Sequence, residues 1–361
     1  MNHPPRNIVL KVIFLLIIAT AELSAVEFRI QVLDELGEPV PEATVSLYFD
    51  DGPNHPRYFK REGLTDEDGR FSASANARIN VGITVKKQGF YPFGVPNAQP
   101  LDYGMKELPE VFEQIFRIRR IIKPIPLFAR RTNWNAPGEE AYRLPETDTW
   151  IGFDFKAIDW VAPYGRGKTA DIQFRYTRTF HEIFIPPYTD MTVESRRTNI
   201  RGKFERMGKP FNEAIFHEQA GVWSGTLKIG FVRPGDGWVK VDEAFNPHSK
   251  LQMPHEAPVD GYRDDSWSRY IHSRESMNEI STSNPTYGYF LRTRTELDAA
   301  GNVESAHYAK LVGEIGFYPT GKVWMTYYFN ATPNDRNLEL DPQKNLIRRN
   351  NPWVPVQNLL P

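Results

Sequence analysis

Residues 28–49 of the chain read FRIQVLDELGEPVPEATVSLYF, and residues 64–71 read LTDEDGRF. Apolar residues occupy every second position from Phe28 to Val32, which is typical of a strand with one buried face. A Gly-Glu-Pro segment interrupts this strand, and the alternation then resumes. In the second stretch Gly69 favours a left-handed turn, and the neighbouring aspartates accept hydrogen bonds from backbone amides. Together the two stretches predict a small β-sandwich.

The same region carries three short motifs, which are Gly37-x-Pro39-Val40-x-x-Ala43-x-Val45, Thr65-Asp66-x-x-Gly69-x-Phe71 and Lys87-x-Gly89-Phe90. In these residues the chain resembles the carboxypeptidase regulatory-like family, a transthyretin-related β-sandwich that is often appended to secreted bacterial proteins. The resemblance covers about residues 26–95. It implies an extracytoplasmic spacer, stabiliser or interaction module, and it supplies no catalytic residues.

The first 25 residues predict a secretory signal peptide. Arg6 and Lys11 supply positive charge, residues 12–18 (VIFLLII) are apolar, and small residues follow. The apolar run is shorter than the roughly 20 residues of a transmembrane helix. We expect cleavage after Ala21 or Ala25, a secreted or periplasmic (cell-envelope) location, and no membrane span in the mature chain.

The amino-acid composition excludes several classes of function. The chain has no cysteine, which excludes disulfides and thiol catalysis. Its 44 basic and 45 acidic residues nearly cancel, so we expect no nucleic-acid partner. A length of 361 residues fits about two domains. The aromatic share of 13%, with 29 Pro and 25 Gly, favours strands and turns over helices.

Breaks in the pattern divide the chain into segments. We predict residues 26–96 as the first sandwich, 97–126 as a proline-marked linker and 127–361 as a larger β-rich domain. Within the linker, residues 107–122 could form a short helix with Val111, Ile115 and Ile118 inward, but the β-branched residues of 115–122 favour a strand.

In the larger domain, alternating segments are separated by turn residues, and no βαβ rhythm is present. The clearest unit is a three-stranded antiparallel meander over residues 287–329, with Ser305–Phe317 as its middle strand. The predicted fold class is therefore all-β, with a small N-terminal β-sandwich and a larger antiparallel β-sandwich or jelly-roll-like domain.

Two segments imitate functional motifs. Residues 162–169 (APYGRGKT) approximate a phosphate-binding loop, but residues 171–179 alternate like a strand where such a loop requires a helix. Asp66-x-Asp68-Gly69 imitates the start of a calcium loop, but Ala77 occupies the position of its bidentate Glu. We interpret the first segment as a hairpin loop and the second as a turn.

No other local signature for catalysis or metal binding is present. Ser224 lacks the spacing of a nucleophile elbow, and none of the eight histidines belongs to an H-E-x-x-H motif. Ligands distant in the sequence stay an open alternative, with His217, His248 and His255 as the first residues to inspect. We predict no metal site and no cofactor.

The most suggestive local cluster lies in residues 261–271 (GYRDDSWSRYI), where Asp264 and Asp265 stand beside Trp267 and Tyr270. Carboxylates bind sugar hydroxyls, and aromatic rings pack against sugar C–H faces. The cluster lies within a loop-rich connection of about 40 residues, a length that is often functional. We predict these four side chains as ligand-binding residues, with a solvated loop as the alternative.

These observations favour a non-enzymatic secreted or envelope protein. It would bind a glycan or an extracellular protein partner, or serve in surface assembly. The alternative is a carbohydrate-active hydrolase or lyase on a β-sandwich that uses paired carboxylates. A cleft with two carboxyl groups about 5–10 Å apart beside Trp or Tyr would favour the enzyme.

Overall fold

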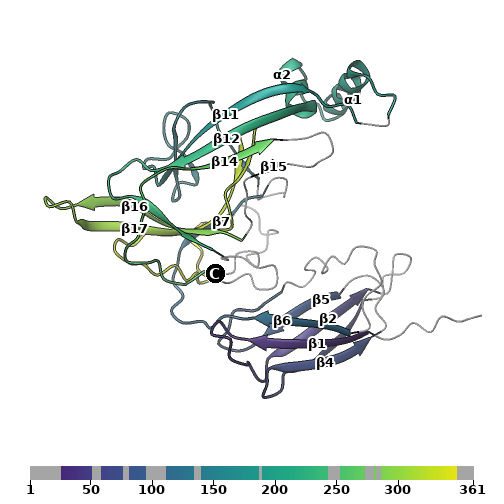
Figure 1. Cartoon of the computed structure of the whole chain (residues 1–361), viewed down its shortest axis with the longest axis vertical. Helices are drawn as coiled ribbons and strands as arrows, with labels where there is room; N and C mark the ends of the chain where they lie inside the picture. The colour runs from purple at the N-terminus through teal and green to yellow at the C-terminus, as the bar shows by residue number, and fades with distance from the viewer. Residues whose placement is uncertain are drawn as a thin grey trace, which may run out of the picture.

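Two three-stranded sheets form the N-terminal part of the computed structural model, which describes residues 26–50, 58–75, 81–94, 111–133, 140–186, 189–242, 253–272, 280–281 and 286–347. The predicted signal peptide lies outside the described residues. The sheet orders are β4-β1-β6 and β3-β2-β5 (Figure 1). The strands are β1 (Val26–Leu33), β2 (Thr44–Asp50), β3 (Tyr58–Leu64), β4 (Arg70–Ala75), β5 (Val81–Lys86) and β6 (Val111–Arg117). Only β1 and β6 run parallel to each other.

The alternation read from the sequence sets the core between these sheets. Phe28, Ile30 and Val32 of β1 point inward and meet Val45 and Leu47 of β2, and each of the five is at most 1% exposed. Burial of such side chains contributes about 1.5–3 kcal/mol each. The predicted small β-sandwich is confirmed.

Residues 66–69 form a turn, as predicted. One carboxylate oxygen of Asp66 accepts the amide N–H of Asp68 at 3.0 Å and that of Arg70 at 2.7 Å. Gly69 has φ +70°, and a Cβ there would lie 2.4 Å from the carbonyl oxygen of Val32. One carboxylate oxygen of Asp66 therefore closes the turn by accepting two backbone amides.

Strand β6 lies inside the segment that the sequence assigned to the linker. It pairs with β1 over seven residues, and Phe112 and Phe116 are buried in the core of the first sandwich. The strand begins at Val111, earlier than the expected start at residue 115. The sequence pattern missed this start because the outward-facing positions include the apolar residues Val111 and Ile115, so apolar and polar residues do not alternate clearly. The predicted linker thus contains a strand of the first sandwich.

The second sandwich pairs a six-stranded sheet, β10-β9-β11-β12-β14-β15, with a five-stranded sheet, β13-β16-β17-β20-β7. Every strand pair in it is antiparallel, which confirms the predicted fold class. Its strands are β7 (Phe128–Arg131), β9 (Ile151–Asp154), β10 (Asp159–Trp160), β11 (Ile172–Ile183), β12 (Gly221–Gly230), β13 (Gly237–Val241), β14 (Trp267–His272), β15 (Ile280–Ser281), β16 (Gly288–Leu297), β17 (Val303–Val312) and β20 (Thr326–Asn330).

The predicted meander is interrupted by a small third sheet. Strand β17 ends at Val312, because the following Gly313 has a left-handed backbone with φ +79°. In the sequence, β18 (Gly316–Tyr318) and β19 (Lys322–Trp324) follow β17 and precede β20, which pairs with β17. These two short strands form a separate sheet with β8 (Tyr142–Arg143). The middle strand expected over Ser305–Phe317 is therefore two strands in two sheets.

Two helices, α1 (Val193–Arg206) and α2 (Glu213–Ala220), connect β11 to β12 and were not expected from the sequence. Thr192 caps α1 through a reciprocal capping box with Ser195, and Asn212 caps α2. No residue of α1 is buried, so the helix shows no apolar stripe that a sequence pattern would reveal. Both helices stand at the far end of β11 and β12 (Figure 1).

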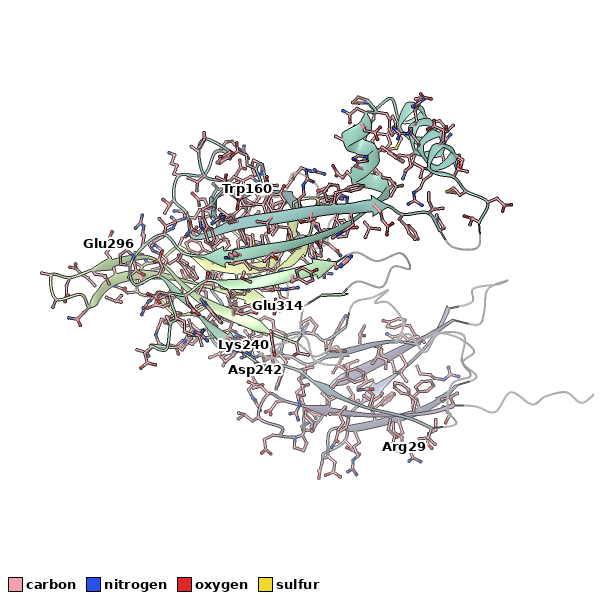
Figure 2. All side chains as sticks on the ribbon, turned by 45° about the horizontal axis from the view of Figure 1, so that its top comes forward. Arg29, Trp160, Lys240, Asp242, Glu296 and Glu314 are labelled. Atoms are coloured by element: carbon pink, nitrogen blue, oxygen red, sulfur yellow. The ribbon has the colours of Figure 1, made fainter. Side chains whose placement is uncertain are left out.

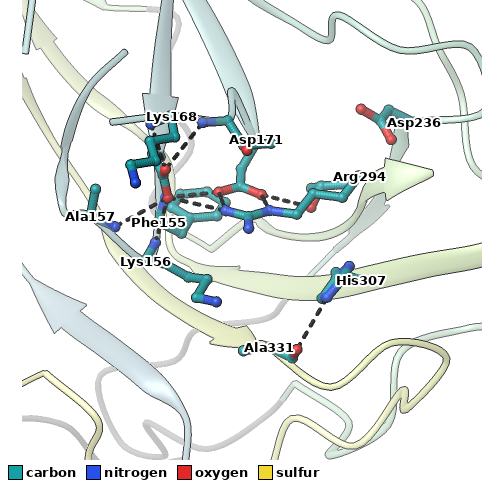
Figure 3. A network of polar contacts seen from close by, with 12 residues as sticks. Phe155, Lys156, Ala157, Lys168, Asp171, Asp236, Arg294, His307 and Ala331 are labelled. Atoms are coloured by element: carbon teal, nitrogen blue, oxygen red, sulfur yellow. Dashed lines mark hydrogen bonds and ion pairs between the residues drawn. The ribbon is translucent and has the colours of Figure 1, made fainter. Parts of the chain in front are cut away.

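A buried guanidinium ties the two sheets of the second sandwich together (Figure 3). Arg294 of β16 donates to Asp171 through Nε at 2.7 Å and through Nη2 at 2.8 Å, and Nη2 also donates to Asp154 at 3.0 Å. Both carboxylates come from the opposite sheet, at the end of β9 and the start of β11. Because buried carboxylates are costly without partners, this bidentate pairing sets how the sheets face each other.

The same network explains the segment that imitates a phosphate-binding loop. The amides of Lys168 and Thr169 donate to the second carboxylate oxygen of Asp154, at 3.0 and 3.2 Å. Although burial alone raises the pKa of Asp154, these amides and Arg294 hold that pKa below its usual value. The element that follows is strand β11, not a helix, so the segment is not a phosphate-binding loop. It is not a hairpin loop either, because it joins β10 to β11, which lie on opposite sides of β9 in the sheet.

A second buried carboxylate holds the two sandwiches to each other. Glu339 accepts the hydroxyl of Tyr91 at 2.8 Å and the amides of Ile122 and Lys123 at 2.8 and 2.6 Å. Its side chain is 1% exposed. Nearby, burial lowers the pKa of Lys310 to about 7, and its Nζ lies 4.8 Å from the centre of the Tyr328 ring. The junction between the two sandwiches is therefore buried and polar, and the three hydrogen bonds to Glu339 fix how its segments meet.

Replacement of Arg294 by Gln should lower the free energy of unfolding by about 3–5 kcal/mol, because two buried carboxylates lose their cation. Urea denaturation followed by tryptophan fluorescence measures this loss. The matched control is Arg263→Gln, which removes an exposed pair with Asp265 and should cost less than about 1 kcal/mol. Equal losses in the two variants would contradict the assigned role of Arg294.

Asp236 gives a pH-dependent test of the same core. Burial raises its pKa to about 6, and only one of its two carboxylate oxygens has a hydrogen-bond partner, the amide of Thr295, within the described residues. A raised pKa in an acid means that the folded state loses stability as pH rises from about 4 through 6. Asp236→Asn cannot ionise at this position. Its free energy of unfolding, relative to that of the native protein, should therefore rise by roughly 2–3 kcal/mol as the pH increases from 4 to 7.5. A pH-independent difference in urea denaturation would refute this.

Candidate functional site

The two predicted aromatic residues lie on opposite faces of one strand. Trp267 begins β14 and points into the core, where its ring stacks on Tyr289 with centroids 5.1 Å apart. Glu314, labelled in Figure 2, accepts the Tyr289 hydroxyl at 2.8 Å. Tyr270 is three positions further along, and an odd spacing in a strand reverses the face. Its side chain is 39% exposed on the outer surface of the sheet.

The two predicted acids lie in the loop before β14. Asp265 forms an ion pair with Arg263 across 2.6 Å, and its backbone carbonyl accepts the indole N–H of Trp238 at 2.8 Å. Asp264 is exposed. The structure therefore does not bring the predicted acids and aromatics together around one ligand.

A cleft of about 330 Å³ lies elsewhere, where the end of the second sandwich meets helix α2. We call it the α2 cleft. Its lining comes from β8, β11, α2, β12 and the turn after β18, and consists of Arg143, Leu144, Pro145, Tyr176, Arg178, Ala214, His217, Glu218, Trp223 and Thr320. The volume falls within the range of small-molecule sites.

Successive side chains along β11 and β12 point to alternate faces of the sheet, and those on the inward face line this cleft. Tyr176 shares the inward face of β11 with the core residue Phe174, and Trp223 shares the inward face of β12 with Leu227. These inward faces extend beyond the packed core, and α2 covers their ends. The Trp223 indole donates to the carbonyl of His217 at 3.0 Å and so fixes α2 against the sheet.

On the opposite wall, Arg143 is held in place at both its backbone and its side chain. Trp160, labelled in Figure 2, donates its indole N–H to the Arg143 carbonyl at 2.9 Å. The Arg143 guanidinium forms an ion pair with Glu218 of α2 and also donates to the Thr320 carbonyl at 3.4 Å. The wall is therefore preformed and polar.

Two further groups of the cleft are available to a ligand. The Arg178 guanidinium lies 4.8 Å from the centre of the Trp223 ring and makes no ion pair with a described residue. The Tyr176 hydroxyl makes no hydrogen bond within the described part of the chain, and burial raises its pKa, so it stays protonated. A cationic donor and a neutral hydroxyl thus meet beside an aromatic ring.

Among the described residues that line the cleft, Glu218 is the only carboxylate. Hydrolysis by the usual glycosidase mechanisms requires two carboxyl groups flanking the scissile bond. The lining is instead suited to holding a ligand, with donors, one acceptor and aromatic surface in fixed positions.

A second polar cluster lies on the outer face of the six-stranded sheet. The Ser224 hydroxyl is 2.8 Å from Nε2 of His181, and the His181 ring stacks on His272 with centroids 4.9 Å apart. The sequence patterns did not single out either histidine. No described carboxylate is bonded to His181, so the group lacks the third member of a catalytic triad.

The histidines marked for inspection have different environments. His217 lines the α2 cleft, and Phe180 stacks on its ring. His255 is buried at the junction of the sandwiches, where burial lowers its pKa to about 4. His248 lies outside the described residues. Within the described ranges, no group of three His, Cys, Asp or Glu side chains is placed to hold a metal ion.

No protein-family model matches this chain, and no curated protein matches it in sequence. A 3-chlorocatechol 1,2-dioxygenase from Rhodococcus opacus 1CP matches 27% of the chain with 15% identity and a TM-score of 0.21, and the match spans only 61% of the dioxygenase.

Two further structures are matched over more of the chain. A protein from Bacteroides uniformis ATCC 8492, provisionally described as carbohydrate-binding, has 9% identity and a TM-score of 0.18, with coverage of 86% of this chain and 98% of that one. BcpA, the major pilin subunit of Bacillus cereus, has 11% identity and a TM-score of 0.19, with coverage of 85% and 96%. At these TM-scores none of the similarities carries an argument about function. In the described parts of the chain, the helices are too short or too polar to cross a bilayer.

Trp223→Phe tests how α2 is held over the cleft. Loss of the indole bond to His217 removes about 1 kcal/mol from the attachment of the helix. We expect amide hydrogen exchange within Glu213–Ala220 to become about fivefold faster, as measured by mass spectrometry. The control Trp150→Phe, at a partly exposed position, should leave exchange in α2 unchanged.

Proposed function

We propose that the protein is a non-enzymatic, extracytoplasmic glycan-binding protein and that the α2 cleft is its binding site. The observation that carries the proposal is the convergence of Trp223, the Tyr176 hydroxyl, Arg178 and the Arg143–Glu218 pair in one preformed cleft. Sugars present C–H faces that pack on aromatic rings and hydroxyls that bond to charged groups.

The balance of side chains supports binding over hydrolysis. Glu218, the one carboxylate among the described lining residues, is already paired with Arg143. In the cleft this carboxylate can accept hydrogen bonds from sugar hydroxyls, and the described lining offers no second carboxyl group to complete the pair that glycosidases use.

We further propose that the first sandwich is a carboxypeptidase regulatory-like accessory domain that supports the glycan-binding domain at the cell envelope. The motifs at Gly37–Val45 and Thr65–Phe71 and the signal peptide predicted from the first 25 residues support this assignment. The polar junction at Glu339 is consistent with a support role, because it joins the sandwiches through specific buried bonds.

A glycan array followed by calorimetry with the best oligosaccharide tests the proposal. Tyr176→Phe should weaken binding about three- to tenfold, because it removes the hydroxyl. Glu218→Gln should weaken binding about tenfold, because it replaces a charged acceptor by a neutral amide and breaks the ion pair with Arg143. Tyr270→Phe on the outer face and Asp265→Asn in the loop before β14 are matched controls and should bind like the native protein.

Two outcomes would refute the proposal. Weaker binding by Tyr270→Phe with unchanged binding by Tyr176→Phe would move the site to the outer face of the sheet. Release of reducing sugar from polysaccharide that is lost in Asp264→Ala or Asp265→Ala would make the protein a hydrolase.

A further inference from the structure

Building on the proposed glycan site, we propose that the ligand is an acidic saccharide with one carboxylate per bound residue, and that Arg178 binds this carboxylate. The inference names the charge class of the ligand, which the proposed function leaves open.

The charges of the cleft provide the first argument. The described lining residues include two guanidinium groups, Arg143 and Arg178, and one carboxylate, Glu218, so two positive charges less one negative charge leave an excess of one. Arg143 and Glu218 neutralise each other directly. The charge that remains without a partner among the described residues is that of Arg178.

The neighbouring strand shows the effect of this excess. Lys322 of β19 stands opposite Arg143 of β8. Burial, and next the positive charge of Arg143, lower the pKa of Lys322, while Glu218 acts in the opposite direction. Lys322 is thus a further basic residue beside Arg143 at this end of the sandwich, where a bound anion would be attracted.

The position of Arg178 suits a carboxylate. Its guanidinium is held over the Trp223 ring by a cation–π contact, so less side-chain freedom is lost when a ligand binds. The planar fork of Arg binds a carboxylate through two parallel hydrogen bonds. A pyranose ring packed at the edge of Trp223 would carry its carboxylate towards this fork.

Glu218 argues against more highly charged ligands. A phosphate monoester, with up to two negative charges, would be repelled by Glu218 more strongly than a singly charged carboxylate, whereas sugar hydroxyls would donate to Glu218. A ligand with several hydroxyls and one carboxylate matches both the donors and the acceptor that line the cleft. Uronic and sialic acids belong to this chemical class.

The experiment is an array of uronate and sialylated oligosaccharides, each paired with its methyl ester or desialylated form, probed with the full mature chain. We expect the bound glycans to be acidic and their neutral partners to bind at least tenfold more weakly. Arg178→Gln should abolish this preference, and Arg178→Lys should retain part of it, because an ammonium keeps the charge but not the fork.

Arg175→Gln is the matched control. Arg175 lies on the same strand, but it faces the outer surface and pairs with Asp148 at 2.7 Å, so its loss should leave binding unchanged. Affinity for the acidic glycan should fall with added salt in the native protein and in Arg175→Gln, but much less in Arg178→Gln.

The outcomes separate this inference from the proposed function. Equal binding of acidic and neutral partners, with loss in Tyr176→Phe, would overturn the acidic class and leave glycan binding in place. Absence of binding to every glycan on the array would overturn both. A preference for acidic glycans that survives in Arg178→Gln would overturn the role of Arg178.

Discussion

The second sandwich depends on the cost of leaving charge unpaired inside a protein. Arg294 reaches across the core to Asp154 and Asp171. Asp154 also accepts backbone amides of the loop between β10 and β11, and Asp171 accepts the amide of Phe155, directly after β9. Each partner would be unfavourable in this interior alone. The arrangement of the two sheets must therefore satisfy all three groups at once.

The cleft also illustrates how a site can arise from residues that serve the fold. Trp223 is largely buried and fastens α2, yet its ring supports the guanidinium of Arg178. The Arg143 carbonyl is held by Trp160 while its side chain contacts α2. Such support keeps side chains in place before a ligand arrives, which lowers the entropic cost of binding.

The sequence predicted the strands well wherever one face is apolar and the other polar. This condition holds for Phe28–Val32 and fails for β6, where Val111 and Ile115 are exposed. It also fails for α1, which buries no residue and so carries no helical stripe. Capping residues such as Thr192 and Asn212 were the available signals for the helices.

The candidate site was less predictable than the fold. Trp267 and Tyr270 looked like one cluster, but strand geometry sends them to opposite faces. The residues of the α2 cleft, in contrast, are spread from Arg143 to Thr320, and only the pairing of strands brings them together. Local sequence reasoning has no access to such pairings.

The Glu339 junction has a consequence for the order in which the molecule assembles. Tyr91 and Glu339 are 248 residues apart in the chain, so the carboxylate that joins the sandwiches is added long after the first sandwich is complete. Domains fold as units from the N-terminus during synthesis. All strands of the first sandwich therefore precede Glu339 in the chain by more than 200 residues, and the bond that attaches it to the second sandwich can close only once the segment around Glu339 has been made.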